Sequence, residues 1–260
     1  MTQNNTPLLR VSDLTMMYGD RVGCRNVSFD LRPGEVLGIV GESGSGKSTL
    51  LRSISAQQEP TKGVVEYHTR IDGIRDVYQI SEAQRRLLMR TDWAFVHQNA
   101  RDGLRMNVSA GANIGERLMA VGDRHYGNIR AAAGNWLGKV EIAEERLDDL
   151  PSTFSGGMQQ RLQIARNLVT SPRLVFMDEP TGGLDVSVQA RLLDLLRGLV
   201  HDLNLAVIIV THDLAVARLL SHRLMVMQGG AVIESGLTDQ VLDDPQHAYT
   251  QLLASSILQN

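Results

Sequence analysis

The sequence has 260 residues, of which 43% are hydrophobic, and a net charge of −3. A chain of this length can bury a substantial core without disulfide staples. Its charge excludes a globally basic field, so we expect no nucleic-acid partner. The single cysteine, Cys24, excludes an internal disulfide framework and is typical of a cytoplasmic, reducing location. We interpret Cys24 as a small apolar core residue.

The sequence contains no candidate for a membrane span. Its polar start lacks the basic and apolar segments of a signal peptide. The longest apolar run, LAVIIV at residues 205–210, is far shorter than the ~20 residues that cross a bilayer. We therefore expect a soluble protein that acts at a membrane only through a partner.

Short strands are predicted from Leu8 to about Tyr67. Within this region, residues 26–41 alternate apolar and polar side chains, turn at Pro33-Gly34 and continue into the apolar run VLGIV. Such a run is typical of a strand that is buried on both faces of a sheet. The pattern predicts β structure that leads into a central core strand.

A phosphate-binding motif directly follows this strand. The sequence GESGSGKST fits G-x-x-x-x-G-K-[ST] and precedes a helical segment, which argues against a chance glycine-rich turn. We expect backbone N–H groups from Ser43 to Ser48 to form a nest for the β-phosphate. Lys47 would add charge at the β- and γ-phosphates, Ser48 would bind Mg²⁺, and Thr49 would reach the α-phosphate. The predicted nucleotide-binding residues here are Gly41, Ser43, Gly44, Ser45, Gly46, Lys47, Ser48 and Thr49.

Helical periodicity begins at about residue 100 and continues to about residue 172. Residues 108–121, 128–140 and 158–169 are the candidate helices. Because strands flank this region on both sides, we interpret it as a helical insertion into an α/β core.

The last of these helices starts with a second candidate anion site. In FSGGMQQR, Phe154–Arg161, a serine and two glycines precede the first helical turn. Glycines allow close backbone approach, and N–H groups at a helix start point outward at an anion. Met158 interrupts the polar residues. If the serine and the glycine amides do the binding, Met158 should matter little, and Gln159, Gln160 and Arg161 could supply polar contacts.

Two carboxylates are predicted beside the phosphate loop. LVFMDEP places four apolar residues in a buried strand and Asp178 and Glu179 at its carboxyl end, the edge at which parallel sheets bind ligands. Asp178 suits Mg²⁺, through water, and Glu179 could deprotonate an attacking water. A strand that ends in DEP is common and carries little information alone, but its pairing with the phosphate motif favours a functional role.

The rest of the chain is predicted to complete the sheet. Between LVFM and LAVIIV, one helical face is apolar, with Val188, Leu192, Leu195, Leu196 and Leu199. Strand, helix and strand in this order imply a parallel βαβ unit. Residues 224–236 resemble a hairpin that turns at Gly229-Gly230, and a short helical tail follows from residue 238 to residue 258.

Gln98 and His212 each end a predicted strand. A lone glutamine or histidine at such a position is more often a solvated loop residue. We expect both strands to lie beside the phosphate-loop strand, which would bring both side chains to the γ-phosphate. No other histidine has ligand spacing.

The order and spacing of these motifs resemble an ATP-binding cassette (ABC) ATPase. The resemblance rests on GESGSGKST, Gln98, FSGGMQQR, LVFMDEP, GGLD at residues 182–185, and His212. It covers nearly the whole chain and implies a P-loop NTPase of α/β class. That fold would be a single nucleotide-binding domain over residues 1–260, with an antiparallel β subdomain, a helical insertion at about 100–172 and a tail at about 238–260. Methionine at residue 158 departs from the glutamine usual in the family.

The resemblance also implies how the second anion site is used. Two cassettes would pair head to tail, with two ATP molecules and Mg²⁺ between them. The opposite subunit would supply Ser155, Gly156 and Gly157 to the γ-phosphate, and Asp185 would couple the two sites. Tyr18 would stack on adenine, Gln98 would join the metal ligands Ser48 and Asp178 and sense the nucleotide, and Glu179 and His212 would be catalytic.

Within the superfamily, HQNARDGLRMNVSAGANIGERL and DDPQHAYTQLL resemble peptide and nickel importer ATPases. The run from Asp102 to Arg130 is more similar to the ATP-binding subunit of the phosphonate carbon–phosphorus lyase system. That similarity implies a soluble lyase core as partner, with the helical insertion as the docking surface and Arg105, Asn107 and Arg124 as docking candidates. A single cysteine cannot hold an iron–sulfur cluster, so the C–P bond chemistry would belong to the partner.

Three hypotheses stay open from the sequence. The chain could be an ATPase that drives or gates a soluble phosphonate-cleaving complex. It could be the energy-coupling subunit of a membrane importer, with a permease as partner. It could also be a nucleotide-dependent binding module whose turnover is incidental. A P-loop kinase is disfavoured, because it would explain neither FSGG nor His212. The particular phosphonate, the step that ATP drives and the stoichiometry of the complex are not predicted.

Overall fold

The computed structural model describes residues 6–257 and contains two sheets. In order across it, the larger sheet consists of β10 (Ala231–Leu237), β9 (Arg223–Gln228), β3 (Val36–Val40), β8 (Ala206–Thr211), β7 (Leu174–Asp178) and β6 (Trp93–Val96). The five strands from β9 to β6 are parallel, and β10 pairs antiparallel with β9. The predicted hairpin is therefore confirmed, and so is the buried strand VLGIV, which is β3.

The smaller sheet is antiparallel and confirms the predicted β-rich start. It consists, in order, of β2 (Arg21–Leu31), β1 (Leu9–Tyr18), β4 (Lys62–His68) and β5 (Ile74–Asp76). One face of it packs on the larger sheet and on α1 (Lys47–Ile54), so that Leu9 and Val65 share a buried cluster with Ile39 and Leu50. This packing fixes the end of β1 beside the phosphate loop. Cys24 is fully buried in the same cluster, as expected, and burial raises the pKa of its thiol to about 11.

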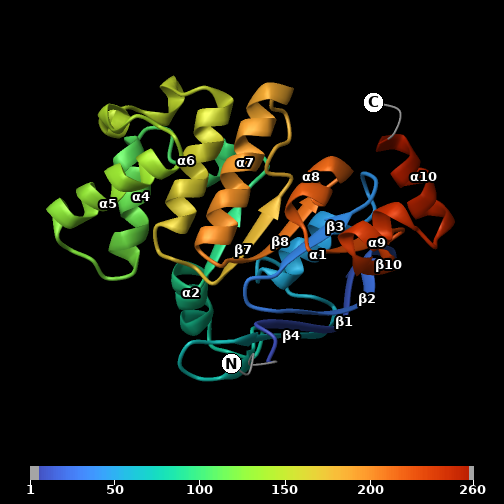
Figure 1. The fold of residues 1–260 in the computed structure, drawn as a ribbon. Helices are drawn as coiled ribbons and strands as arrows, with labels where there is room; N and C mark the ends of the chain where they lie inside the picture. Colours follow the sequence, from blue (N-terminus) through green and yellow to red (C-terminus); the bar gives the residue numbers. More distant parts are fainter. Residues whose placement is uncertain (1–5, 258–260) are drawn as a thin grey trace, which may run out of the picture.

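The predicted helices between residues 100 and 172 are confirmed with small shifts at their ends. Between β5 and β7, the helices are α2 (Glu82–Thr91), α3 (Ala100–Gly103), α4 (Ala110–Ala120), α5 (Tyr126–Lys139) and α6 (Gly156–Leu168), with short 3₁₀ turns at Glu144–Asp148 and Pro151–Thr153. In Figure 1, α4, α5 and α6 lie together on one side of the molecule. They share a core with β6 and β7, which includes Ile114, Trp136 and Leu162.

The remaining helices follow β7. They are α7 (Val186–Asp202), α8 (Leu214–Leu220), α9 (Thr238–Asp243) and α10 (Ala248–Ile257). The βαβ unit β7–α7–β8 is parallel, as predicted. Leu192, Leu196 and Leu199 of α7 are buried, whereas Val188 and Leu195 are only partly so. Helices α9 and α10 lie on the opposite side of the molecule from α4 and α5 (Figure 1). They account for the predicted tail, whose last residues, 258–260, lie outside the described part.

One expectation from the sequence is wrong, and one helix was missed. Strand β6 is at the edge of the sheet, separated from β3 by β7 and β8, so only the strand before His212 adjoins β3. The order of strands depends on long-range pairing that the local pattern does not carry. Helix α2 was not predicted, although Ser81 and Gln84 form a capping box at its start. Within residues 6–257, no helix is long and apolar enough to cross a membrane.

An ionic cluster centred on the buried Asp92 joins the two sheets. Asp92, directly before β6, accepts hydrogen bonds from the Tyr67 hydroxyl at 3.2 Å and from Arg70 Nε. Arg173 Nη1 lies 4.0 Å from the same carboxylate and donates to the His68 carbonyl. Burial and the nearby carboxylate raise the pKa of Tyr67 well above its ordinary value, so its hydroxyl stays a donor.

Candidate functional site

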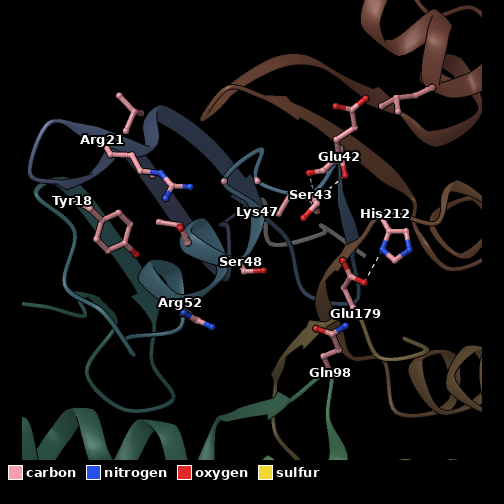
Figure 2. A pocket seen from close by; sticks show the side chains of 17 residues that line it. Tyr18, Arg21, Glu42, Ser43, Lys47, Ser48, Arg52, Gln98, Glu179 and His212 are labelled. Atoms are coloured by element: carbon pink, nitrogen blue, oxygen red, sulfur yellow. Dashed lines mark hydrogen bonds and ion pairs between the residues drawn. The ribbon is translucent and has the colours of Figure 1, made fainter. Parts of the chain in front are cut away.

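A cavity of about 990 Å³ opens at the carboxyl ends of the parallel strands. Its wall combines the phosphate motif with segments that follow β1, β6, β7 and β8, as Figure 2 shows. The wall residues are Tyr18, Arg21, Val22, Gly23, Gly41, Glu42, Ser43, Gly44, Gly46, Lys47, Ser48, Thr49, Arg52, Gln98, Glu179, His212 and Leu253. Eleven predicted site residues therefore share one cavity: Tyr18, Gly41, Ser43, Gly44, Gly46, Lys47, Ser48, Thr49, Gln98, Glu179 and His212.

Two glycines of the phosphate loop are required by close backbone packing. Gly41 has φ +148°, and a Cβ atom there would lie 2.3 Å from the carbonyl oxygen of Met227 on β9. Gly46 has φ +103°, and a Cβ atom would lie 2.2 Å from the carbonyl oxygen of Gly23 on β2. A side chain at either position would clash with backbone, which cannot yield cheaply. The loop is therefore fixed between the two sheets at both of its ends.

Lys47 is buried on the inner side of the loop. Its Nζ donates hydrogen bonds to the carbonyls of Gly41 at 2.7 Å and Glu42 at 2.8 Å. Burial lowers the pKa of Lys47, and the carboxylates of Glu179, Asp178 and Glu42 oppose that shift. Ser45 is buried beside Lys47, and its N–H donates to the Glu42 carbonyl, so it supports the loop from within.

Ser48 lines the cavity and contacts Asp178, which is not itself among the lining residues. The Ser48 hydroxyl donates to Asp178 Oδ1 at 3.2 Å, which links the start of α1 to the end of β7. Burial raises the pKa of Asp178, while the Ser48 hydrogen bond favours the charged form. Two oxygen donors thus converge here from distant parts of the chain.

Glu179 and His212 form a close pair at the mouth of the cavity. His212 Nδ1 lies 2.7 Å from Glu179 Oε2, and Figure 2 shows this contact. The Glu179 side chain is 18% exposed and that of His212 is 65% exposed. The Glu179 backbone has φ +43°, and its N–H donates to the Val210 carbonyl on β8. The two strand ends therefore fix the two side chains relative to each other.

Gln98 reaches the same cavity from the edge strand β6. It packs over Gly182, where a Cβ atom would lie 3.1 Å from Gln98 Nε2. The preceding residue, His97, is held by α6, because its N–H donates to Gln163 Oε1 and its carbonyl accepts from the side-chain amides of Gln160 and Gln163. The position of Gln98 is thus tied to the helix that starts at Gly156.

One side of the cavity carries Tyr18 and two arginines. Tyr18 is 44% exposed, and its hydroxyl donates to Gln58 Oε1 at 2.8 Å. Arg21 and Arg52 line the same side and were not predicted from the sequence. No local motif marks them, because both follow from the fold of β2 and α1 around the loop.

Ser155, Gly156, Gly157 and Asp185 are absent from the cavity wall. Ser155 caps α6 by accepting from the Met158 N–H, and both Ser155 and Gly156 are exposed. Gly157 is buried against α7, where a Cβ atom would lie 2.4 Å from Val188 Cγ1. Asp185 is exposed at the start of α7. The second anion site is therefore a separate, outward-facing surface of the same chain.

Met158 and the residues after it turn toward the protein interior. Met158 Sδ lies 3.6 Å from Arg146 Nη1, and the side chain packs on the core of the helical region. Gln159 and Gln160 are buried and hydrogen-bond to backbone carbonyls, and Arg161 binds the carbonyls of residues 140 and 141. The suggestion that these three residues face an anion is wrong, because their polar groups are used within the chain.

Comparisons with known proteins agree with this geometry. Residues 24–182 match the family described as ABC transporter. The chain belongs to this family and is an ATP hydrolase of the ATP-binding cassette type. It is 70% identical over 256 residues to "Putative phosphonates utilization ATP-binding protein PhnK" of Escherichia coli (strain K12), which covers 98% of this chain and 100% of that protein. The resemblances to cassette ATPases and to a phosphonate-system ATPase are therefore confirmed.

More distant relatives share the fold over most of the chain. The dipeptide transport ATP-binding protein DppD of Escherichia coli (strain K12) is 34% identical over 256 residues, which is 96% of this chain and 78% of that protein. Among solved structures, the dimeric post-hydrolysis state of the ATP-binding cassette MJ0796, bound to ADP and Pi, superposes with a TM-score of 0.78 at 29% identity. That match covers 88% of this chain and 98% of the other.

We predict that Met158→Gln leaves ATPase activity within a few-fold of wild type. The Met158 side chain contacts Arg146 and the helical core, and a glutamine of similar length fits the same space. Steady-state phosphate release at saturating ATP measures the effect. A hundredfold loss of activity would mean that this side chain takes part in nucleotide turnover.

Proposed function

We propose that two copies of this chain pair head to tail and hydrolyse ATP at two shared sites. The observation that carries the proposal is that each chain has an outward-facing Ser155-Gly156 surface outside its own phosphate cavity. Because a helix start with glycine amides suits an anion, this surface fits the γ-phosphate held by the other copy. The dimeric structure of MJ0796, to which the chain is similar, supports pairing of two copies.

Within each site, the chain's own loop would hold the nucleotide. The N–H groups of residues 43–48 face the phosphates, and Lys47 supplies the charge. Tyr18, exposed at the edge of the cavity, is positioned to stack on adenine. Asp185, at the exposed start of α7, would couple the two sites across the dimer interface.

Mg²⁺ fits the oxygen donors at and next to the cavity wall, Ser48 and Asp178. Ser48 and Asp178 lie 3.2 Å apart, and Gln98 enters the same cavity. Mg²⁺ prefers oxygen ligands and is commonly bound by one or two carboxylates together with substrate phosphates, so this donor set suits it. When bound, the ion would neutralise charge that develops on the phosphates. Gln98 would also transmit the nucleotide state to α6 through the hydrogen bonds that join His97 to Gln160 and Gln163.

Glu179 and His212 would carry the proton transfer. Glu179 is mostly buried within reach of the loop, and a carboxylate there can accept a proton from an attacking water. His212, 2.7 Å away, would orient that carboxylate and contact the γ-phosphate. Closing the dimer would exclude bulk water, and loss of the γ-phosphate would loosen it.

In the cell, we propose that this ATPase drives or gates a soluble, cytoplasmic carbon–phosphorus lyase complex in phosphonate breakdown. The 70% identity to a protein named for phosphonates utilization supports this assignment. The helical insertion is the proposed docking surface, where Arg105, Asn107 and Arg124 are exposed. Arg105 is paired with Glu116, and Arg124 binds the Met119 carbonyl, which leaves Asn107 as the simplest candidate.

Two alternatives remain as outcomes of experiment. The 34% identity to DppD favours an importer subunit that binds a membrane permease. The second alternative is a nucleotide-dependent binding module. The same fold would bind ATP, and hydrolysis would not be needed for its role in the cell.

We predict that Glu179→Gln lowers ATP hydrolysis by about a hundredfold or more, since the amide cannot accept the proton. ATP binding should remain, and ATP should now hold the dimer together in gel filtration. Glu66→Gln, on the antiparallel sheet, is the matched control and should retain activity. Normal growth of cells carrying Glu179→Gln on a phosphonate as sole phosphorus source would favour the binding module.

We predict that the chain, affinity-purified from cells grown on a phosphonate, retains soluble lyase subunits, and that ATP changes their amount. Mass spectrometry of the purified complex identifies the partners. Asn107→Arg places a longer, charged side chain on the proposed docking surface. It should weaken this retention without changing ATPase activity. Recovery of an integral permease instead would support the importer.

A further inference from the structure

The carboxyl-terminal part of the chain contacts the phosphate loop at several points. The Gly230 N–H, in the β9–β10 turn, donates to the Ser45 carbonyl at 3.0 Å. The Met227 carbonyl is the group that excludes a side chain at Gly41. From α10, the Tyr249 hydroxyl accepts a hydrogen bond from the Glu42 N–H at 2.9 Å. The first two contacts are made by backbone, whereas the third depends on one side chain.

Tyr249 is held firmly where its hydroxyl meets the loop. The residue is 8% exposed and packs in a cluster that includes Val40, Leu214 and Val226. Its own N–H donates to His247 Nδ1 at 3.1 Å. The turn before α10 is fixed to β10, because Glu234 accepts from the N–H groups of Gln246 and His247. The aromatic ring is therefore anchored to the sheet independently of the phosphate loop.

The hydrogen bond falls at a sensitive position of the loop. Glu42 directly precedes the amides of residues 43–48 that are proposed to hold the phosphates. Its N–H is bound by Tyr249, and its carbonyl accepts the Lys47 ammonium at 2.8 Å. Rotation of either peptide plane at Glu42 would move an acceptor of Lys47 and redirect the amides that follow. Fixing the N–H therefore preorganises both the nest and the lysine.

We propose that Tyr249 is a positioning residue for the phosphate loop. Its hydroxyl fixes the Glu42 peptide, so that ATP meets a loop already shaped for its phosphates. The inference rests on the proposed function in one respect, that this loop binds the ATP phosphates. Because Tyr249 lies on α10, outside the residues that match the family, it also makes nucleotide affinity depend on how the tail is packed.

Tyr249→Phe tests the proposal, since it removes only the hydroxyl and keeps the buried ring. We expect the Kd for ATP and for ADP, measured by calorimetry, to rise about three- to tenfold, as for one lost hydrogen bond. KM should rise with little change in kcat, and the Glu42 amide should exchange its hydrogen faster. Loosening the start of α10 with Glu234→Ala should act in the same direction.

Tyr67→Phe is the matched control, because it removes a buried hydroxyl that binds Asp92 rather than the loop. It should lower the urea midpoint of unfolding without changing the Kd for ATP. The positioning role is overturned if Tyr249→Phe binds ATP as tightly as wild type, or if any change in its Kd for ATP equals that of Tyr67→Phe. The nucleotide site would stand in either case. If the wild-type chain does not bind ATP, both the proposed function and this inference fail.

Discussion

Close packing of backbone against backbone around the phosphate loop is the constraint on which the rest of the structure depends. Gly41 lies against a carbonyl of β9 and Gly46 against a carbonyl of β2, so both sheets hold the loop. The Lys47 ammonium then closes it from inside by binding the carbonyls of Gly41 and Glu42. A loop held in this way keeps its amides oriented without a ligand, and little ordering remains to oppose binding.

The parallel sheet delivers the other reactive groups to this fixed loop. Asp178 ends β7 and Glu179 follows it, His212 follows β8, and Gln98 follows β6, so each side chain takes its position from the end of a strand. The Ser155-Gly156 surface is the exception, because α6 carries it on the outside of the molecule. In the proposed mechanism, the groups for ATP hydrolysis are divided between these two places on each chain. Pairing of two copies brings both sets to one nucleotide in the proposed mechanism.

Local sequence was sufficient for the parts of the site that depend on short-range pattern. The phosphate loop, the carboxylates after LVFM and the amphipathic α7 follow from spacing and apolar runs. The edge position of β6 could not be predicted, because strand order depends on pairing between distant segments. Gln160 and Gln163 resemble solvated helix residues, yet they are buried against His97. The contact between Tyr249 and Glu42 spans 207 residues and has no local signal.

The central claim is that each site combines the phosphate loop of one copy with the Ser155-Gly156 surface of the other. Mixing two inactive variants tests this claim most directly. Lys47→Ala removes the charge of the phosphate loop, and Gly156→Asp places a negative charge on the exposed helix start, where it repels phosphate without disturbing the fold. In a head-to-tail pair of one copy of each, one site combines an intact loop with an intact Ser155-Gly156 surface. The account predicts that each variant alone is inactive and that an equal mixture recovers up to about a quarter of wild-type ATPase activity, since about half of random pairs are mixed. A mixture as inactive as its components, or a strictly monomeric chain that hydrolyses ATP at the full rate, would contradict it.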